Sequence, residues 1–299
     1  MERILHYPIN IDSDGITISE FLKKHNFSSQ NITHLKKMPQ SVLVNGQWKY
    51  MNTLLYQGDH LTIHIQEMSS NSKILPCKLP FPVLYEDEDL VVINKPYHMP
   101  IHPSQNNYDN TLANAAAYYY EVLQNTPFIY RCINRLDKDT SGLTILAKNM
   151  YSAGLLASQM QRGEIKRFYV AVVKGIFPFS YGKITAPIGR KPGSTIERMV
   201  DELYGEKSIT YYHKLQTFSH YTLMALRLKT GRTHQIRVHM SHLGYPLLGD
   251  SLYDPECDLS YISRQALHAA RIIFQHPVTG KKVKLDAPLP EDMISLLHP

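Results

Sequence analysis

Short strand-like runs of apolar residues recur along the chain, and a few segments show helical spacing. Near the N-terminus, residues 16–25 (ITISEFLKKH) space three apolar side chains like one face of a helix: Ile18, Phe21 and Leu22. Residues 41–50 (SVLVNGQWKY) predict two short strands around an Asn-Gly turn, and residues 56–65 (YQGDHLTIHI) predict a closing strand. We therefore expect a small α+β domain over residues 1–67.

Residues 68–82 (MSSNSKILPCKLPFP) are rich in Ser, Asn and Pro and carry no periodicity, which is typical of a linker. Beyond them, a strand pattern that ends in Asn-Lys-Pro (residues 82–96) is followed by a helix pattern at residues 110–124. Tyr-rich and β-branched runs such as RFYVAVVKG and YTLMALRLKTG then alternate irregularly with helical segments. This mixture predicts an α+β domain over residues 83–299, with a mixed, largely antiparallel sheet.

Composition places the chain among globular proteins, because 43% of its 299 residues are hydrophobic. It contains no apolar run of about 18 residues and no secretion signal, so we expect a cytoplasmic protein without membrane spans. Three scattered cysteines argue against disulfides and a cysteine zinc site. The net charge is +6, yet residues 1–70 carry six Lys/Arg and six Asp/Glu, so the positive excess lies in the larger domain. That distribution suits a polyanionic partner, and a generic basic surface explains it equally well.

The stretch CINRLDKDTSGLTILAKN (residues 132–149) places two carboxylates, Asp137 and Asp139, in front of a buried strand. Its D-x-D-x-S-G pattern resembles a calcium loop, but Lys148 stands where such a loop needs a glutamate. An aspartyl-phosphate site is a weak alternative, because the preceding segment carries two arginines and is not an apolar strand. A solvated turn and an active site are equally supported by this stretch alone, although the turn does not explain Arg135 beside Asp137.

Residues 228–244 (LKTGRTHQIRVHMSHLG) predict a strand end, a glycine turn and a helix, with Thr233 as N-cap and Gly244 as C-cap. Ile236, Met240 and Leu243 form its expected buried stripe. Arg232 precedes the helix, and His234 and Arg237 lie one turn apart, an arrangement suited to anions. No acid or cysteine completes a zinc site with His234, His239 and His242, so we expect these histidines to face solvent or substrate.

With these two segments in view, residues 80–299 resemble the RluA-type pseudouridine synthases. The resemblance covers the whole larger domain and depends on five segments that occur in the family's order: EDEDLVVINKP, NRLDKDTSGLTILAKN, KRFYVAVVKG, KTGRTHQIRVHMSHLGYPLLGDSLY and LHAARIIFQHPVTGK. One position departs from the family, which usually has His where this chain has Asn134. The N-terminal helices and hairpin in turn resemble a small ribosomal-protein-type RNA-binding domain.

The resemblance implies an isomerase that detaches uracil from its ribose in RNA and rejoins it through carbon 5, without cofactor or metal. Matched residue by residue, it implies Asp137 as the catalytic aspartate, Tyr169 as the active-site tyrosine and Arg237 as the basic partner of the aspartate. The target uridine would have to leave its stack, so further residues are expected to contact substrate or RNA: Lys95, Asn134, Arg135, Arg190, Lys191, Arg232 and His234. The expected partner is structured RNA, ribosomal or transfer, bound by a monomer.

Two other function classes remain open at this stage. The departure at Asn134 is compatible with an RNA-binding protein that has lost catalysis, although the three catalytic positions are intact. A glycoside hydrolase would need two carboxylates across a glycosidic bond, and Asp139 is expected instead to be tied to backbone groups of its turn.

Overall fold

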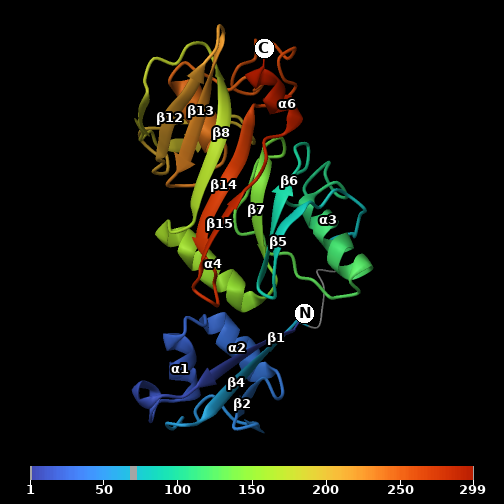
Figure 1. The fold of residues 1–299 in the computed structure, drawn as a ribbon, viewed down its shortest axis with the longest axis vertical. Helices are drawn as coiled ribbons and strands as arrows, with labels where there is room; N and C mark the ends of the chain where they lie inside the picture. The colour runs from blue at the N-terminus through green and yellow to red at the C-terminus, as the bar shows by residue number, and fades with distance from the viewer. Residues whose placement is uncertain (1, 68–72, 299) are drawn as a thin grey trace.

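The computed structural model describes residues 2–67 and 73–298, and its N-terminal part lies at one end of an elongated molecule (Figure 1). This part is a four-stranded antiparallel sheet in the order β1-β4-β2-β3 with two helices against it. Its elements are β1 (Glu2–Pro8), a 3-10 turn (Ile11–Ser13), α1 (Ile18–Lys24), α2 (Ser29–Lys37), β2 (Val42–Val44), β3 (Gln47–Trp48) and β4 (His60–Gln66).

Local sequence explains most of this part. Thr17 and Glu20 form a reciprocal capping box that starts α1. Asn45 and Gly46 both have positive φ, at 51° and 79°, as the tight turn between β2 and β3 requires. The predicted helix, hairpin and closing strand are confirmed. Strand β1 was not predicted, because its short, mixed sequence becomes a strand only through pairing with β4.

The larger part is built on a nine-stranded sheet in the order β5-β6-β7-β14-β8-β13-β12-β9, with β15 paired to β14. Only β7 and β14 pair in parallel, so the expected α+β fold with a mixed, largely antiparallel sheet is confirmed. The strands are β5 (Val83–Glu86), β6 (Leu90–Lys95), β7 (Ser141–Ala147), β8 (Lys166–Lys174), β9 (Tyr181–Ile184), β12 (Thr210–Thr217), β13 (Tyr221–Leu228), β14 (Leu267–Gln275) and β15 (Lys282–Asp286).

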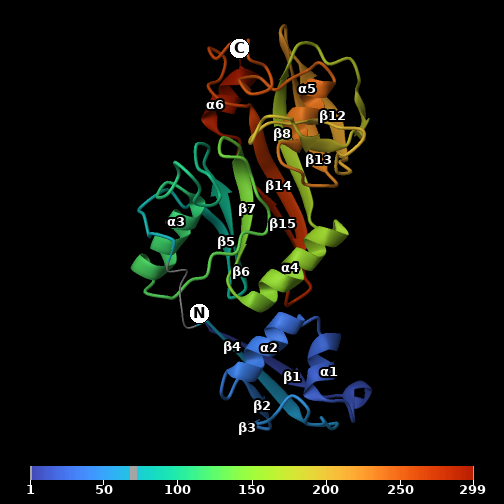
Figure 2. The same cartoon turned by 180° about the vertical axis from the view of Figure 1, so that it is seen from behind.

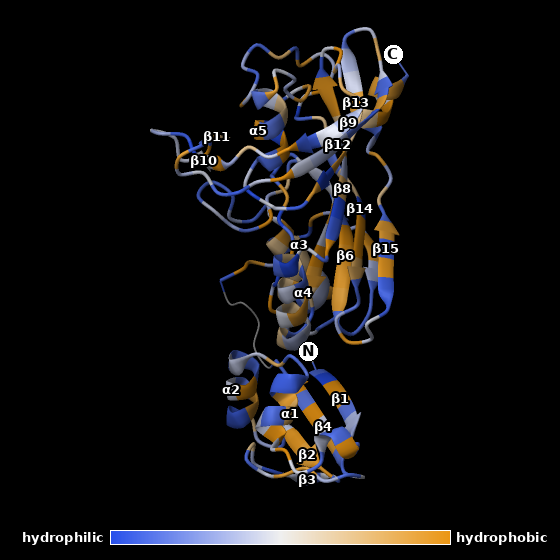
Figure 3. Ribbon diagram, turned by 90° about the vertical axis from the view of Figure 1, so that its left-hand side faces the viewer, coloured by the Kyte–Doolittle hydropathy of each residue, from blue (hydrophilic) through white to orange (hydrophobic). Residues whose placement is uncertain are grey.

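Helices cover this sheet at three places (Figure 2). Helix α3 (Leu112–Ala117) continues as a π-helical segment (Tyr118–Leu123), α4 (Met150–Arg162) lies beside the N-terminal part, and α5 (Gln235–His242) contacts β12. A short α6 (Glu291–Ile294) and a 3-10 turn (Ser295–Leu297) end the chain. A hairpin of β10 (Ile188–Arg190) and β11 (Arg198–Val200) projects away from the sheet (Figure 3). None of the helices in the described ranges is long and apolar enough to cross a membrane.

The expected linker falls partly outside the described residues, at 68–72. Its remaining part, residues 73–82, is held on the larger part: Asn114 donates to Leu75 O at 2.8 Å and accepts from Cys77 N at 3.2 Å. Ile74, Leu79 and Phe81 pack against the core of the larger part. The domain boundary at residues 68–82 stays a prediction.

Tyr151 of α4 joins the two parts of the molecule. Its ring stacks on Phe27 at 4.0 Å between centroids, and its hydroxyl donates to His25 O at 2.9 Å. Tyr151 is thereby a buried member of the N-terminal core. Two ion pairs span the same surfaces: Arg3–Asp89 at 3.1 Å and Arg131–Glu67 at 2.8 Å.

Candidate active site

Asp137 lies in a loop immediately before β7, and three consecutive backbone carbonyls of this loop accept hydrogen bonds. Residues 137, 138 and 139 each offer a carbonyl oxygen to a donor at 3.1 Å, respectively Thr140 N, Met99 N and Arg264 Nη1. At the start of β7, Gly142 has φ +112°, and a Cβ there would lie 2.4 Å from the carbonyl oxygen of Ala269 on β14. Glycine is therefore required for β14 to approach β7, and this contact fixes where the loop ends.

Lys95, which we expected to contact RNA, is fully buried instead. Its ammonium group donates to the carbonyl oxygens of Pro96, Met99 and Lys138 at 2.7, 2.8 and 3.0 Å. Burial lowers its pKa to about 7, although Asp139 and Asp137 oppose that shift. The prediction is wrong because the side chain at the end of β6 points into the protein, where it clamps the loop that carries Asp137.

Asn134 is also buried and does not face RNA. Its amide nitrogen donates to Leu143 O at 2.9 Å, and its amide oxygen accepts from Ile145 N at 2.8 Å. Both groups belong to β7, so Asn134 fastens the segment before Asp137 to that strand. The expected substrate contact is wrong, since the amide is already used by backbone groups.

Arg237 on α5 lies between two carboxylates. It forms a two-pronged ion pair with Asp250, at 2.8 Å from Nε and 2.7 Å from Nη2, and its Nη1 donates to Asp137 Oδ2 at 3.2 Å. Burial opposes its charge, but Asp250 and then Asp137 raise the pKa of Arg237 above its usual value. The guanidinium is thus fixed from behind by Asp250 and presents one nitrogen to Asp137.

The start of α5 differs from the prediction. The helix begins at Gln235 with His234, not Thr233, as N-cap, and His234 has a left-handed φ of 57°. The side chain of Gln235 holds the turn before the helix: its Oε1 accepts from Arg232 N at 3.0 Å, and its Nε2 donates to Thr210 Oγ1 at 3.0 Å. At the other end the C-cap is Leu243, not Gly244 as predicted, and Gly244 follows it with a left-handed φ of +82°.

His234 faces the site, whereas His239 does not. His234 Nε2 lies 3.9 Å from Asp137 Oδ2 and its Nδ1 bonds the hydroxyl of Tyr253 at 2.9 Å, while burial lowers its pKa. His239 is fully buried and bonds Thr210 Oγ1 and Ala186 O, both at 2.9 Å. For His239 the expectation of a solvent- or substrate-facing side chain is wrong, because it stabilises the packing of α5 on β12.

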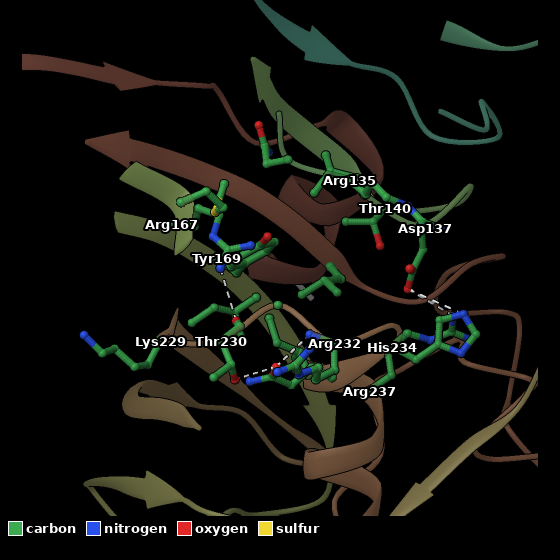
Figure 4. A pocket seen from close by; sticks show the side chains of 18 of the residues that line it. Arg135, Asp137, Thr140, Arg167, Tyr169, Lys229, Thr230, Arg232, His234 and Arg237 are labelled. Carbon is green, nitrogen blue, oxygen red and sulfur yellow. Dashed lines mark hydrogen bonds and ion pairs between the residues drawn. The ribbon is translucent and has the colours of Figure 1, made fainter. Parts of the chain in front are cut away.

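A pocket of about 500 Å³ brings these groups together (Figure 4). Tyr169 on β8 lies in its wall, and burial raises the pKa of its hydroxyl, an effect that Arg167 opposes and Asp137 increases. The lining contains one carboxylate, Asp137, among several cationic side chains: Arg135, Arg167, Lys229, Arg232 and Arg237. We expected the carboxylate of Asp139 to bond the backbone of its own turn. It bonds His98 instead and lies outside the pocket lining.

The remaining expected RNA contacts lie at different distances from this pocket. Arg135 and Arg232 line it, and Arg232 also pairs with Glu206. Arg190 and Lys191 lie on the projecting β10–β11 hairpin, where Lys191 pairs with Glu197 at 3.0 Å. These two residues are exposed and outside the pocket lining.

One group of metal-type ligands, Asp87, Asp89 and His276, occurs among the described residues, far from Asp137 in the sheet. Its atoms are already bonded: His276 Nε2 to Asp87 at 2.8 Å, and Asp89 to Asn149 and Ser152 at 3.0 and 2.8 Å. We interpret this group as a hydrogen-bond network at the base of α4.

Sequence reasoning missed Asp250 and Arg167. Asp250 lies within the quoted LLGDSLY segment, yet nothing in its residue type shows that it pairs with Arg237. Arg167 precedes Tyr169 by two residues on one strand, and that spacing alone places both side chains on the same face.

The geometry is that of a single carboxylate held by a guanidinium beside an aromatic ring in a cationic pocket. Such a site suits attack on, or stabilisation of, one carbon centre of a polyanionic substrate, and it lacks the second carboxylate that a glycoside hydrolase needs within its lining. Comparison with known proteins agrees: the family model described as RNA pseudouridylate synthase matches residues 89–242. The chain belongs to this family and is an RNA pseudouridine synthase, an isomerase.

Sequence similarity to known proteins covers both parts of the chain. A further family model, the RluD ribosomal pseudouridine synthase N-terminal domain, matches residues 5–61. The chain is 36% identical over 282 residues to the uncharacterized RNA pseudouridine synthase YjbO of Bacillus subtilis, covering 94% of this chain and 98% of that protein. It is 37% identical to ribosomal large subunit pseudouridine synthase D of Haemophilus ducreyi, over 82% of this chain and 78% of that one. The solved structure of human RNA pseudouridylate synthase domain containing 1 is similar with a TM-score of 0.56 and 26% identity, over 70% and 83% of the two chains.

Proposed function

We propose that this enzyme converts a uridine of large-subunit ribosomal RNA to pseudouridine, with Asp137 as its essential carboxylate. The substrate proposal is supported by the relatives named as ribosomal large subunit pseudouridine synthases, which match both parts of the chain. The catalytic proposal depends on one observation: Asp137 is the only carboxylate lining the described pocket, and Arg237 donates to it at 3.2 Å.

In the proposed reaction, the bond between ribose C1′ and uracil N1 breaks and a bond between C1′ and C5 forms. The proton on C5 is lost and N1 gains one, so the product is an isomer. Asp137 attacks a carbon of the nucleotide or stabilises the separated ribose, while Arg237 orients it. Tyr169 packs against the uracil ring, and its hydroxyl, kept protonated by burial, can take part in proton transfer.

We infer that the protein acts as a monomer in the cytoplasm. We further infer that residues 1–67 and 83–299 are its two domains, joined by residues 68–82. The projecting cations Arg190 and Lys191 and the pocket-rim residues Arg135 and Arg232 would contact RNA phosphates.

Asp137→Asn tests the catalytic proposal. It removes the charge with little change of volume, so isomerisation should fall at least about 1,000-fold while fold and RNA affinity are retained. Release of tritium from RNA labelled at uracil C5 measures turnover. Asp139→Asn is the matched control and should keep most activity, because its carboxylate bonds His98 outside the pocket. Equal losses in the two variants would revive a mechanism with paired carboxylates.

Pseudouridine maps of cellular RNA, with and without the gene for this protein, test the substrate. Loss of one or more sites in large-subunit ribosomal RNA is expected. Loss confined to transfer RNA would reject the ribosomal assignment and leave the enzyme class intact.

A further inference from the structure

Arg167 lies in the pocket at the far side of Tyr169 from Asp137 (Figure 4). Both residues belong to β8, two positions apart, and both are buried on the same face of the strand. Their backbone positions are therefore roughly 6.6 Å apart, a distance on the scale of one nucleotide of an RNA strand. The remaining lining at this end comes from the end of α4 and the turn after β13: Met160, Gln161, Lys229, Thr230 and Gly231.

Arg167 differs from the other buried arginines of the described chain in having no acid partner. Arg237 pairs with Asp250 and Arg264 pairs with Asp292, each through two short hydrogen bonds. Arg167 is 9% exposed, donates one hydrogen bond to Thr230 O at 3.2 Å, and has a buried Nε without a partner. A buried guanidinium without a counter-charge destabilises the free protein.

Space is left for this guanidinium. A Cβ on Gly231 would lie 2.8 Å from Arg167 Nη1, so glycine at this position keeps the approach open. Lys229 adds a second cation at the same end of the pocket, and no carboxylate lines it there. An anion with several acceptor oxygens would satisfy the free N–H groups and balance the charge.

We propose that Arg167 binds the phosphate group next to the target uridine, and that this contact places the ribose of that uridine opposite Asp137. The inference rests on the proposed function, because it requires that the target uridine reaches Asp137 in this pocket. It holds for whichever RNA is modified. The guanidinium fork of Arg167 donates to the non-bridging oxygens of the phosphate. Arg167 is thus a binding residue. Its buried charge destabilises the free enzyme, and the phosphate of the bound RNA compensates that charge.

The test pairs a protein change with an RNA change. Affinities are measured in an Asp137→Asn background with a synthetic RNA that the wild-type enzyme modifies, and with copies in which one linkage near the target is an uncharged methylphosphonate. With Arg167 present, one of these linkages should weaken binding about 10- to 100-fold. Arg167→Met should weaken binding to the natural RNA by a similar factor and should then be insensitive, within about 2-fold, to that same linkage.

Lys166→Met is the matched control. It removes the same charge one residue earlier on β8, from an exposed side chain that is not part of the pocket lining. This variant should keep its sensitivity to the critical linkage. Arg167→Lys should recover only part of the affinity, since an ammonium lacks the fork. The proposal is rejected if each methylphosphonate weakens the RNA affinity of Arg167→Met by the same factor as it weakens that of the enzyme with Arg167.

Stability of the free enzyme separates this role from a structural one. Because Arg167 is buried without a carboxylate, Arg167→Met should unfold at the same temperature as wild type or higher, while Arg264→Met should unfold lower. A clear fall in the melting temperature of Arg167→Met, with unchanged RNA affinity, would show that the guanidinium only supports the fold. If the enzyme does not modify ribosomal RNA, only the substrate proposal is overturned. The affinity test of Arg167 still applies, because it uses any RNA that the enzyme does modify.

Discussion

At the scale of single residues, Arg237 shows why the identity of a basic side chain matters. Asp250 occupies its Nε and Nη2, which leaves Nη1 to hold Asp137. Lysine has one nitrogen and cannot reach both carboxylates in this geometry. Asp250 is therefore a positioning residue that acts on Asp137 through Arg237.

Replacing Arg237 with Lys should lower the single-turnover rate at saturating enzyme about 100-fold or more, because the carboxylate is no longer aimed. RNA affinity and its salt dependence should change little, since Arg237 is buried between acids. Both quantities are measured for this variant and for Arg190→Lys, an exposed control on the β10–β11 hairpin. A binding defect with normal chemistry would assign Arg237 to phosphate contact instead.

Lys95 is the second residue whose role follows from burial. Its pKa is lowered to about 7, so between pH 7 and about 10 the unfolded chain holds a proton on this residue that the folded chain has lost. The free energy of unfolding contributed by this group therefore rises with pH across that window, by at most about 1.4 kcal/mol per pH unit, and its burial is most unfavourable below pH 7.

Lys95→Met should remove this rise, which denaturant unfolding at several pH values between 7 and 10 would measure. Turnover should also fall, because the carbonyl of Lys138 loses one of its two donors and the loop of Asp137 loosens. Lys138→Met, at an exposed position, is the control and should keep the wild-type pH dependence. The same slope in Lys95→Met and wild type would contradict the lowered pKa.

At the scale of elements, β7 depends on a side chain that lies outside it. Asn134 supplies a donor and an acceptor to the backbone of β7, and the strand in turn ends the loop of Asp137. An apolar replacement leaves Leu143 O and Ile145 N buried without partners.

Asn134→Ala should lower the free energy of unfolding by about 2 kcal/mol and Tm by roughly 4–8 °C. Well below Tm, turnover per folded molecule should stay within about 3-fold of wild type, because Asn134 does not reach the substrate. Thermal unfolding and tritium release on the same preparation measure both effects. A large loss of turnover at unchanged Tm would restore a role for Asn134 in the reaction and reject the structural one.

At the scale of the whole molecule, the two parts share a core through Tyr151. Their polar contacts, Arg3–Asp89 and Arg131–Glu67, lie at the same boundary. A deletion of the N-terminal part would therefore expose the Tyr151 ring and leave Asp89 and Arg131 without these partners. Independent folding of residues 83–299, which the linker composition suggested, would come with reduced stability.

The full chain should unfold in one cooperative transition, whereas Tyr151→Ala should separate the two parts into two transitions. Loss of the ring contact with Phe27 should reduce stability by about 3 kcal/mol. Differential scanning calorimetry distinguishes the cases. Tyr85→Phe removes one hydroxyl elsewhere in the larger part and serves as the control, and two transitions already in wild type would refute a shared core.

The sequence by itself determined the features that depend on near neighbours along the chain. The apolar segment that follows the turn at Gly142 predicted the buried strand β7, and the Asn-Gly pair predicted the turn of the β2–β3 hairpin. The motifs around Asp137, Tyr169 and Arg237 predicted the family that the comparisons confirmed. Periodicity and turn chemistry are local properties, so they can be read without the fold.

Only the tertiary structure decided which side chains are buried and what they pair with. Lys95 and Asn134 carry polar groups suited to RNA, yet both are buried in the sheet of order β6-β7-β14-β8. Lys95 bonds the loop of Asp137, and Asn134 bonds the backbone of β7. Asp137 and Arg237 are 100 residues apart, and their contact exists because that sheet and α5 bring two distant segments to one pocket. Desolvation and pairing depend on the sum of all neighbours in space, which no local pattern of residues contains.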